Sequence, residues 1–183
     1  HISYTHTPLR YAWEKEYFEH LPKKLQIARY IGAPIRRYLK YWDKKASKKV
    51  DVFIANSHYI KNKIKKHYKR DAEVIYPPVD INSFSFKDKK QEEYYLMAGR
   101  LIYYKRFDMG IEACNELKKE VRIVGTGSEE GELKKSTKGA KFLGKKSDEE
   151  LRDAYQEAKA LIFPQVEDFG LVAAEAQMCG LPI

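Results

Sequence analysis

Three cations stand together at a point of the chain where an anion could bind. Arg100, Lys105 and Arg106 lie between an apolar run at 94–98 and a helical pattern that begins at Phe107. Arginine can bind a phosphate through two hydrogen bonds, lysine adds a point charge, and the backbone N–H groups at a helix N-terminus favour the same anion. We therefore expect Arg100 and Lys105 to bind a diphosphate, although an ordinary basic turn would look the same in isolation.

Two glutamates, Glu167 and Glu175, stand eight positions apart. The first falls in a loop, and the second lies more than one turn into a helix expected at about 170–178. A carboxylate can accept two hydrogen bonds from adjacent hydroxyl groups, which suits ribose or a hexose. The free N–H groups at the helix start could meet phosphate or sugar oxygens. Alone, the two residues could be a loop acid and a surface helix acid, but the alanines around Glu175 indicate close packing, where an unpartnered carboxylate is costly.

Two glycine-containing turns complete this set of loops. Gly125-Thr126-Gly127 follows the apolar run 121–124, and its glycines would let the backbone approach a ligand closely. The spacing does not fit the dinucleotide-binding fingerprint, and a plain tight turn explains it equally well. The turn at 144–147 could line a base pocket, although structure alone also accounts for it.

Short apolar runs alternate with helical patterns through the second half of the chain. We expect strands at 94–98, 121–124, 140–143 and 160–163, and helices at 107–119, 129–135, 147–158 and 170–178. This alternation predicts an α/β fold with parallel sheets. Ligands bind beyond the carboxyl ends of the strands in such sheets, so the loops that follow the strands should converge.

The first half shows the same kind of alternation. Strands are expected at 2–5, 50–55 and 73–76, and helices at 23–49 and after 57. Ser57 stands where an N-cap would, and Ile60, Ile64 and Tyr68 then share one helix face. We expect the long helix to break near 32–34, because Pro34 disfavours helix at the residue before it.

The organisation of the chain follows from these elements. Two prolines and a polar stretch indicate a linker at 77–91, between a domain at 1–76 and another at 92–183. The absence of an initiating methionine and the apolar residues at both ends suggest an internal piece of a longer protein. The apolar runs are too short to span a bilayer, and the N-terminus lacks the pattern of a secretory leader. Only two cysteines occur, and no Cys/His cluster has zinc spacing, so we expect a reducing cytoplasm and no metal.

The charge is uneven along the chain. The 183 residues have a net charge of +9 in a composition typical of a folded protein. Residues 1–91 carry 21 basic and 9 acidic side chains, and residues 92–183 carry 14 and 17. Basic residues with interleaved aromatics at 36–49 could lie on an anionic membrane, but such helices can equally be simply solvated or part of a core. A nucleic acid is the other anionic partner that the charge would allow. No nucleic-acid-binding motif is present, so we expect no nucleic-acid partner.

These residues together resemble the retaining family-4 (group 1) glycosyltransferases of GT-B architecture, over nearly the whole chain. The segments that carry the resemblance are Ala98-Gly99-Arg100-Leu101 with Lys105, Val124-Gly125-Thr126-Gly127, Phe142-Leu143-Gly144, the E-x7-E element from Glu167 to Glu175, Ala55-Asn56-Ser57 and the run 74–80. The segment from His6 to Trp13 is further similar to the mannosyltransferases of polysaccharide assembly. The first N-terminal strands and glycine-rich loop of the family are missing, as is the close of its C-terminal domain.

The resemblance implies parts of two Rossmann-like domains and a set of residue roles. Arg100 and Lys105 would hold the donor diphosphate, Glu175 would bind the ribose, and His6 would face the reacting centre from the acceptor-side domain. Glu167 would position the donor sugar. The remaining donor-binding residues would be Gly99, Gly125, Gly127, Phe169, Gly170, Leu171 and Val172.

The implied activity is transfer of a hexose, with mannose favoured, from a nucleotide-diphosphate sugar to a glycan or lipid-linked acceptor. The transfer would retain the anomeric configuration and need no metal or cofactor, with GDP-mannose as the favoured donor. The protein would be cytoplasmic, with peripheral contact at the inner face of an anionic membrane, and this piece alone would be inactive. Two alternatives stay open: a nucleotide-sugar-binding or epimerase-type α/β protein, and a basic nucleic-acid-binding protein.

Overall fold

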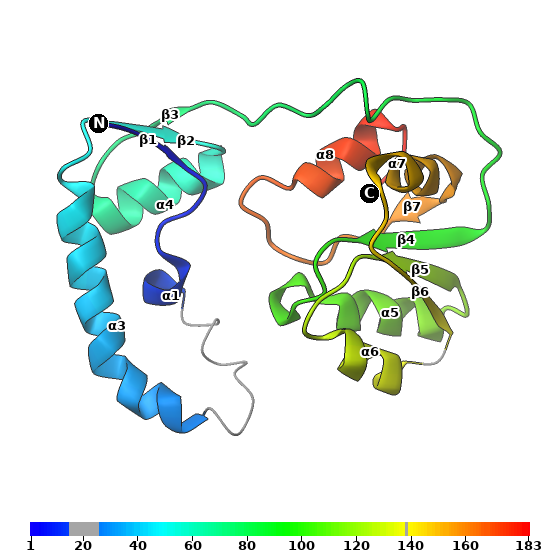
Figure 1. Ribbon diagram of the computed structural model, residues 1–183, viewed down its shortest axis with the longest axis horizontal. Helices are drawn as coiled ribbons and strands as arrows, with labels where there is room; N and C mark the ends of the chain where they lie inside the picture. Colours follow the sequence, from blue (N-terminus) through cyan, green and yellow to red (C-terminus); the bar gives the residue numbers. More distant parts are fainter. Residues whose placement is uncertain (15–25, 138) are drawn as a thin grey trace. The chain divides into compact units, whose positions relative to one another are not determined.

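The computed structural model describes residues 1–14, 26–137 and 139–183, which form two compact units, His1–Pro77 and Pro78–Ile183. Each unit has its own β-sheet with helices packed against it (Figure 1). All strand pairs in both sheets are parallel. The predicted α/β fold with parallel sheets is confirmed.

The sheet of the first unit has the strand order β1-β2-β3. Its strands are β1 Ile2–Thr5, β2 Val52–Ala55 and β3 Glu73–Val74, and its helices are α1 Arg10–Trp13, α3 Gln26–Ser47 and α4 His58–Tyr68. Strands β2 and β3 are shorter than the apolar runs that predicted them, and the short helix α1 was not predicted.

Helix α4 packs against the sheet in the core of the first unit. Ile60 and Ile64 are fully buried and pack against Phe53 of β2. The hydroxyl of Ser57 accepts a hydrogen bond from the backbone N–H of Ile60 at 3.1 Å, which satisfies one free donor of the first turn. The predicted N-cap and the predicted buried face are both confirmed.

Helix α3 runs unbroken from Gln26 to Ser47, so the expected break near 32–34 is wrong. Residues 23–25 of the predicted helix lie outside the described residues. Pro34 is exposed within the helix, where it removes one backbone hydrogen bond. The loss is offset by side chains that fasten α3 to α1. The Nε of Arg36 donates to the carbonyl of Ala12 at 3.1 Å, and Asp43 accepts from the indole N–H of Trp13 at 2.6 Å.

The sheet of the second unit has the order β6-β5-β4-β7. Its strands are β4 Tyr94–Ala98, β5 Glu120–Val124, β6 Ala140–Gly144 and β7 Ala160–Leu161, and its helices are α5 Phe107–Glu116, α6 Glu130–Ser136, α7 Asp148–Glu157 and α8 Leu171–Met178. The S-x-x-E capping box predicted at Ser147 and Glu150 opens α7. Every predicted element of this half is present within a few residues of its expected ends.

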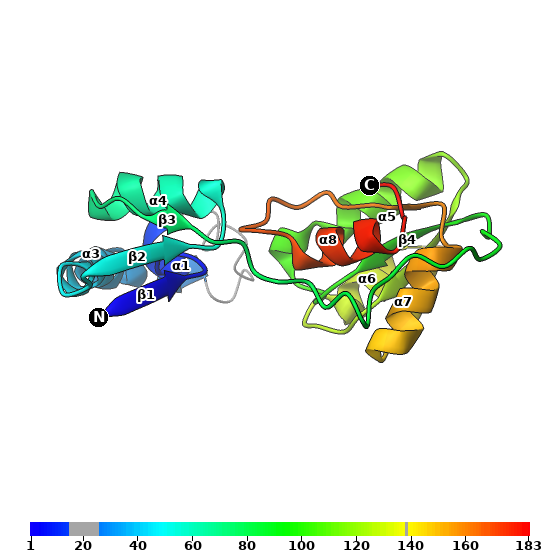
Figure 2. The ribbon, with the colours of Figure 1, turned by 90° about the horizontal axis from the view of Figure 1, so that it is seen from above.

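Alternate residues of strand β4 divide the core of the second unit into two layers. Leu96 and Ala98 pack toward α7 and α8, whereas Met97 packs toward α5 and α6. The ribbon shows the same arrangement, with α7 and α8 on one face of the sheet and α5 and α6 on the other (Figure 1, and from above in Figure 2). A strand buried on both faces reads as a continuous apolar run, as the sequence YYLMA does.

Residues 78–91 of the predicted linker 77–91 pack on the second unit. Phe84 is buried in the core beside Tyr155 of α7. The amide of Gln156 donates to the carbonyl of Ser85 at 2.6 Å. These contacts make the segment part of the second unit.

Backbone contacts join the turns that follow β4 and β5. The N–H of Gly99 donates to the carbonyl of Val124 at 2.9 Å. The N–H of Leu101 donates to the carbonyl of Thr126 at 3.0 Å. Gly125 has a φ of +131°, and a Cβ atom on it would lie 1.9 Å from the carbonyl oxygen of Gly99. Only glycine fits this approach.

We predict that Gly125→Ala lowers the free energy of unfolding by about 3 kcal/mol, because a strained φ and a clash with backbone atoms add together. Urea unfolding followed by circular dichroism measures the change.

The matched control is Gly131→Ala in α6, where a Cβ meets no atom within 4 Å. Alanine favours the helix, so this change should be neutral or stabilise by up to about 1 kcal/mol. An unfolding midpoint for Gly125→Ala equal to that of Gly131→Ala would contradict the close-approach account.

Candidate functional site

The loops expected to carry the chemistry follow neighbouring strands. Strand β4 lies between β5 and β7, all three parallel, so their carboxyl ends share one edge of the sheet. The loops that leave this edge are 99–106, 125–129 and 162–170. They contain the predicted residues Gly99, Arg100, Lys105, Gly125, Gly127, Glu167, Phe169 and Gly170.

An ion pair joins the loop after β4 to the loop after β7. The Nζ of Lys105 pairs with Oε1 of Glu167. The two side chains are only 13% and 19% exposed, so water screens their attraction less than it screens a surface pair. Lys105 ends the short 3₁₀ helix η2, Tyr103–Lys105, which lies just before α5. The structure thus brings together two residues that the sequence assigned to one site from different loops.

Arg100 stands at the same edge but in a different environment. Its side chain is exposed and forms no ion pair with any residue in the described ranges. An exposed guanidinium retains its full capacity to bind an anion from solution. Arg100 and Lys105 are therefore unequal: one is open to solvent, and the other is already paired with a carboxylate.

The start of helix α8 lies beside Glu167. Gly170 is the N-cap residue, with a φ of +89°, and offers no side chain to cap the first turn. A Cβ atom on Gly170 would lie 3.8 Å from the Cβ of Glu167. Leu171 begins the helix and is partly exposed, while Val172 packs against the core. Backbone N–H groups at such a helix start favour an oxygen ligand.

Glu175 lies in the middle of α8 and is half-buried. Its Oε2 accepts a hydrogen bond of 3.4 Å from the hydroxyl of Tyr155 on α7. Burial raises the pKa of Glu175 above its ordinary value of 4.5, the Tyr155 hydrogen bond lowers it, and the charge of Asp148 raises it. The packing expected from the neighbouring alanines is confirmed, and the carboxylate has a partner.

Tyr155 is the residue of this site that the sequence reasoning missed. It is fully buried, and burial together with the Glu175 carboxylate raises its pKa, so the hydroxyl stays protonated and can donate. Leu151, Tyr155 and Ala158 recur at spacings of four and three, which marks the inward face of α7. That periodicity was the available signal for the burial of Tyr155, although it did not indicate a polar partner.

His6 belongs to the first unit, whereas the other predicted site residues belong to the second. It follows β1, is exposed, and packs edge-on against the ring of Tyr4 at 5.3 Å. A cavity of about 450 Å³ opens beside it, lined in part by Thr7, Asp43 and Tyr68. Asp43 accepts from the Tyr68 hydroxyl at 2.8 Å, and burial raises the pKa of Tyr68. The assignment of His6 to a reacting centre stays a prediction.

Among residues 1–14, 26–137 and 139–183 the structure shows no group of three or more His, Cys, Asp or Glu side chains that could hold a metal ion. The charged residues predicted for the site at this edge are Arg100, Lys105, Glu167 and Glu175. The same loops also contain Glu129, Asp168 and Arg106, and Arg106 pairs with Asp108 at 3.2 Å. This set can bind an anion and hydrogen-bond to hydroxyl groups.

Two family models cover the chain. The model described as glycosyl transferases group 1 matches residues 79–183, and the model described as glycosyltransferase family 4 matches residues 1–83. No curated protein matches the chain.

Solved structures with the GT-B fold are similar to the chain. The pneumococcal O-GlcNAc transferase GtfA in complex with UDP and GlcNAc aligns over 77% of this chain and 31% of its own, with 23% identity and a TM-score of 0.58. TarM aligns over 79% and 31%, with 16% identity and a TM-score of 0.66. Anabaena Alr3699/HepE in complex with UDP and glucose aligns over 76% and 47%, with 20% identity and a TM-score of 0.65. The chain therefore spans about a third to a half of the length of these proteins, and the predicted GT-B fold is confirmed.

The raised pKa of Glu175 predicts a pH dependence of stability. A carboxyl group whose pKa is higher in the folded protein than in the unfolded chain favours folding when protonated, and this contribution is lost as the pH rises from about 4.5 through the raised pKa. Glu175→Gln should remove this loss, so the variant should gain stability relative to the wild type over that interval. Urea unfolding of both proteins at a series of pH values measures the difference.

Glu112→Gln, at an exposed position of α5, is the control for removing one negative charge. A stability difference between the wild type and Glu175→Gln that stays constant with pH would contradict the burial of the Glu175 carboxyl group.

Proposed function

Because the chain belongs to the glycosyl transferases group 1, we propose that its parent protein transfers a hexose from a nucleotide-diphosphate sugar to a hydroxyl group of an acceptor. The observation that carries the proposal is the Lys105–Glu167 pair at the carboxyl edge of the second sheet. In this pair, the cation that we propose for the diphosphate and the carboxylate that we propose for the sugar are in direct contact. Both groups are largely shielded from water, and electrostatic interactions are stronger in such an environment than in water.

The donor diphosphate would bind Arg100 and Lys105. Glycosyl transfer develops negative charge on the departing nucleotide diphosphate, and fixed cations lower the barrier most where that charge grows. An arriving diphosphate would compete with Glu167 for Lys105. Glu167 would then be released to accept hydrogen bonds from the donor sugar, so one exchange of partners would couple the two binding events.

The nucleoside would lie farther along α8. Glu175 would accept hydrogen bonds from the ribose hydroxyls while Tyr155 holds its Oε2 in place. The backbone around Phe169, Gly170 and Leu171 would offer N–H groups to the sugar and phosphate oxygens. Glycines 99, 125 and 127 would allow the ligand to lie close to the backbone. At 125 and 127 the fold also requires glycine, because a Cβ atom there would collide with the turn after β4.

Transfer would proceed without a metal and with retention. The cations of the loop after β4 would do the work that a divalent ion does elsewhere, which is to neutralise the leaving diphosphate. Retention would follow from attack on the same face of the sugar, with a leaving phosphate oxygen accepting the proton of the acceptor. His6, from the acceptor-side domain, would hold a group at the reacting centre.

GDP-mannose is the donor we favour, and the acceptor would be a glycan or a lipid-linked sugar. The similarity of the segment from His6 to Trp13 to mannosyltransferases of polysaccharide assembly supports mannose. The two complexes named above contain UDP, so UDP-sugars are the direct competitors. A role in polysaccharide synthesis at the cytoplasmic face of a membrane fits such an acceptor.

We predict that the protein binds nucleoside diphosphates and that Lys105→Ala raises the dissociation constant about 10- to 100-fold, the cost of one hydrogen bond to a charged group. Isothermal titration with GDP, UDP and ADP and with their hexose conjugates measures binding. GDP-mannose should bind more tightly than UDP-glucose, and no sugar transfer is expected from this piece alone.

Lys119→Ala is the matched control, because Lys119 is exposed and precedes β5, at the opposite end of the strands. It should leave the dissociation constant unchanged. Equal weakening by both changes, or binding that does not depend on Lys105, would reject the diphosphate assignment. Tighter binding of UDP-sugars than of GDP-mannose would reject the donor preference but not the diphosphate site.

A further inference from the structure

Helix α1 is a single turn whose position depends on its side chains. It spans Arg10–Trp13, and no side chain of the described residues caps its N-terminus. A helix this short is not stable by itself in water, because its few hydrogen bonds do not offset the cost of ordering the first turn. Ala12 is nevertheless fully buried, and α1 lies beside α3 (Figure 1). The contacts that hold α1 in this place are therefore also the contacts that keep it folded.

Trp13 joins α1 to both α3 and α4. Its indole N–H donates to Oδ2 of Asp43 on α3 at 2.6 Å, and the hydroxyl of Tyr68 on α4 donates to the same oxygen at 2.8 Å. The indole packs against the imidazole of His67 on α4, with 4.3 Å between the ring centroids and 31° between the ring planes. The Nζ of Lys40 lies 5.2 Å from the indole centroid. We call Trp13 and these four partners the Trp13 cluster.

Two further contacts fasten the end of α1. The Nε of Arg36 on α3 donates to the carbonyl of Ala12 at 3.1 Å, and Lys63 on α4 pairs with Glu14 at 2.6 Å. Residues 6–9 connect β1 to α1 and contribute to the lining of the cavity beside His6. A movement of α1 would therefore also move this segment.

His67 is the member of the Trp13 cluster that can change its charge near neutral pH, because the ordinary pKa of histidine lies there. The charged groups that act on it come from two helices: Lys66 and Lys63 from α4, and Lys40 and Asp43 from α3. Burial lowers the pKa of His67 below its ordinary value of 6.5, the three ammonium groups lower it further, and Asp43 raises it. A proton on His67 would thus add a positive charge where three are already close.

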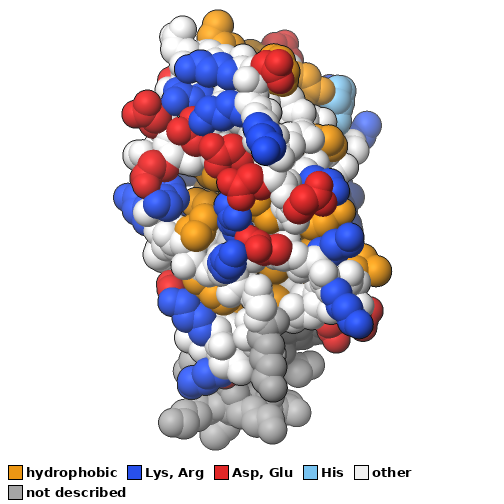
Figure 3. All heavy atoms as spheres, turned by 90° about the vertical axis from the view of Figure 1, so that its right-hand side faces the viewer, with side chains coloured by type: hydrophobic (Ala, Val, Ile, Leu, Met, Phe, Trp, Pro, Cys, Tyr) orange, Lys and Arg blue, Asp and Glu red, His pale blue; other side chains and the backbone are white. Residues whose placement is uncertain are grey.

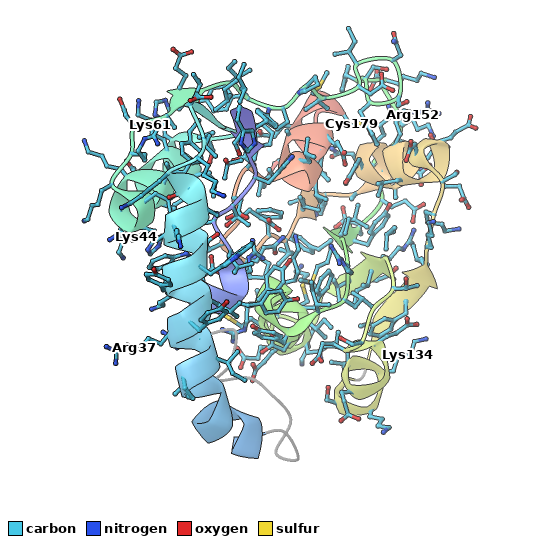
Figure 4. The ribbon with its side chains drawn as sticks, turned by 60° about the vertical axis from the view of Figure 1, so that its left-hand side comes forward. Arg37, Lys44, Lys61, Lys134, Arg152 and Cys179 are labelled. Carbon is cyan, nitrogen blue, oxygen red and sulfur yellow. The ribbon has the colours of Figure 1, made fainter. Side chains whose placement is uncertain are left out.

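Other charged surfaces of the chain differ from this cluster. The face of the second unit shown in Figure 3 carries acidic and basic side chains side by side, so a charge added there would have opposite charges nearby. On α3, Arg37 and Lys44 project away from the helix on the side opposite α1 (Figure 4). Among these surfaces, the Trp13 cluster is the one where a proton would be opposed by several cations.

One attraction works in the other direction. The face of an indole attracts a cation, so a protonated His67 would gain some stabilisation from Trp13. The ammonium group of Lys40 already lies near that indole, so the two cations would share one ring and repel each other. We expect burial and the three ammonium groups to have the larger effect.

We propose that the Trp13 cluster is a proton-sensitive latch, in which α1 is docked on α3 and α4 while His67 is neutral and is released when His67 takes up a proton. A histidine whose pKa is lower in the docked than in the released state favours docking only in its neutral form. Docking is therefore strongest above pH 6.5 and weakens as the pH falls through the lowered pKa of His67. Each unit between the two pKa values weakens docking about tenfold. The proposal uses only residues of the first unit, so it does not depend on the transferase activity proposed for the parent protein.

Two measurements on the 183-residue protein test the latch. NMR titration should give His67 a lower pKa in the folded protein than in the same protein unfolded in urea. Trp42→Phe leaves Trp13 as the only tryptophan, so acrylamide quenching of its fluorescence reports the exposure of this indole. The quenching constant should rise as the pH falls, with the midpoint of the His67 titration, because the indole leaves the cluster.

Variants in the Trp42→Phe background assign the effect to His67. His67→Phe keeps a ring against Trp13, and His67→Gln keeps a polar side chain, but neither takes up a proton. Both should keep the indole protected between about pH 5 and 8, the range in which histidine titrates. Circular dichroism establishes that each variant is folded.

A second pair of variants tests the role of the neighbouring cations. Lys66→Gln should raise the pKa of His67 by about 0.3, the effect of one exposed charge at close range. The matched control is Lys65→Gln, at the preceding exposed position of α4. Lys65 lies about 200° around the helix from His67, so this change should shift the pKa less.

Three results would overturn the proposal. The first is a pKa of His67 in the folded protein equal to or above the value in urea, which would show that the attraction of the indole prevails. The second is an unchanged quenching constant while His67 titrates, which would show that α1 stays docked. The third is the same pH dependence of quenching in His67→Phe and His67→Gln, which would assign it to another group.

Discussion

The attraction between Lys105 and Glu167 is the interaction on which the candidate site depends. The two residues come from loops separated by about sixty positions, and the parallel order β5-β4-β7 brings those loops to one edge of the sheet. The backbone contact of Gly99 with Gly125 leaves no room for a side chain between the turns, so the edge is shaped by glycine as well as by charge. A low-exposure ion pair is stable only while each charge has a partner, which makes Lys105 responsive to a competing anion.

The two units differ in how they arrange their charged side chains. The second unit gathers opposite charges at the ends of its strands and places a half-buried carboxylate, Glu175, against the hydroxyl of Tyr155. In the first unit, Asp43 and Arg36 hold α3 to α1, whereas Arg37, Lys44 and Lys45 of α3 are exposed. The uneven charge of the chain therefore coincides with its division into two units.

Local rules predicted most of the fold, and long-range contacts account for the remainder. The apolar run at 94–98, the capping box at Ser147 and the N-cap Ser57 each depend on neighbours a few residues away, and each was predicted correctly. The break predicted at Pro34 was wrong because α3 is also held by hydrogen bonds to α1, which lies more than twenty positions earlier in the chain. For the same reason the sequence named Lys105, Glu167 and Glu175 but could not show that the first two pair, or that Tyr155 holds the third.

The central claim is that a nucleoside diphosphate binds at the carboxyl edge of the second sheet and takes Lys105 from Glu167. Titration of ¹⁵N-labelled protein with GDP, followed by NMR, tests it most directly. The account predicts that the largest shift changes fall at Gly99, Gly125 and Gly170 and at the side-chain signal of Lys105, with Lys119 unchanged. Shift changes spread over the surface, or concentrated in the first unit, would contradict it.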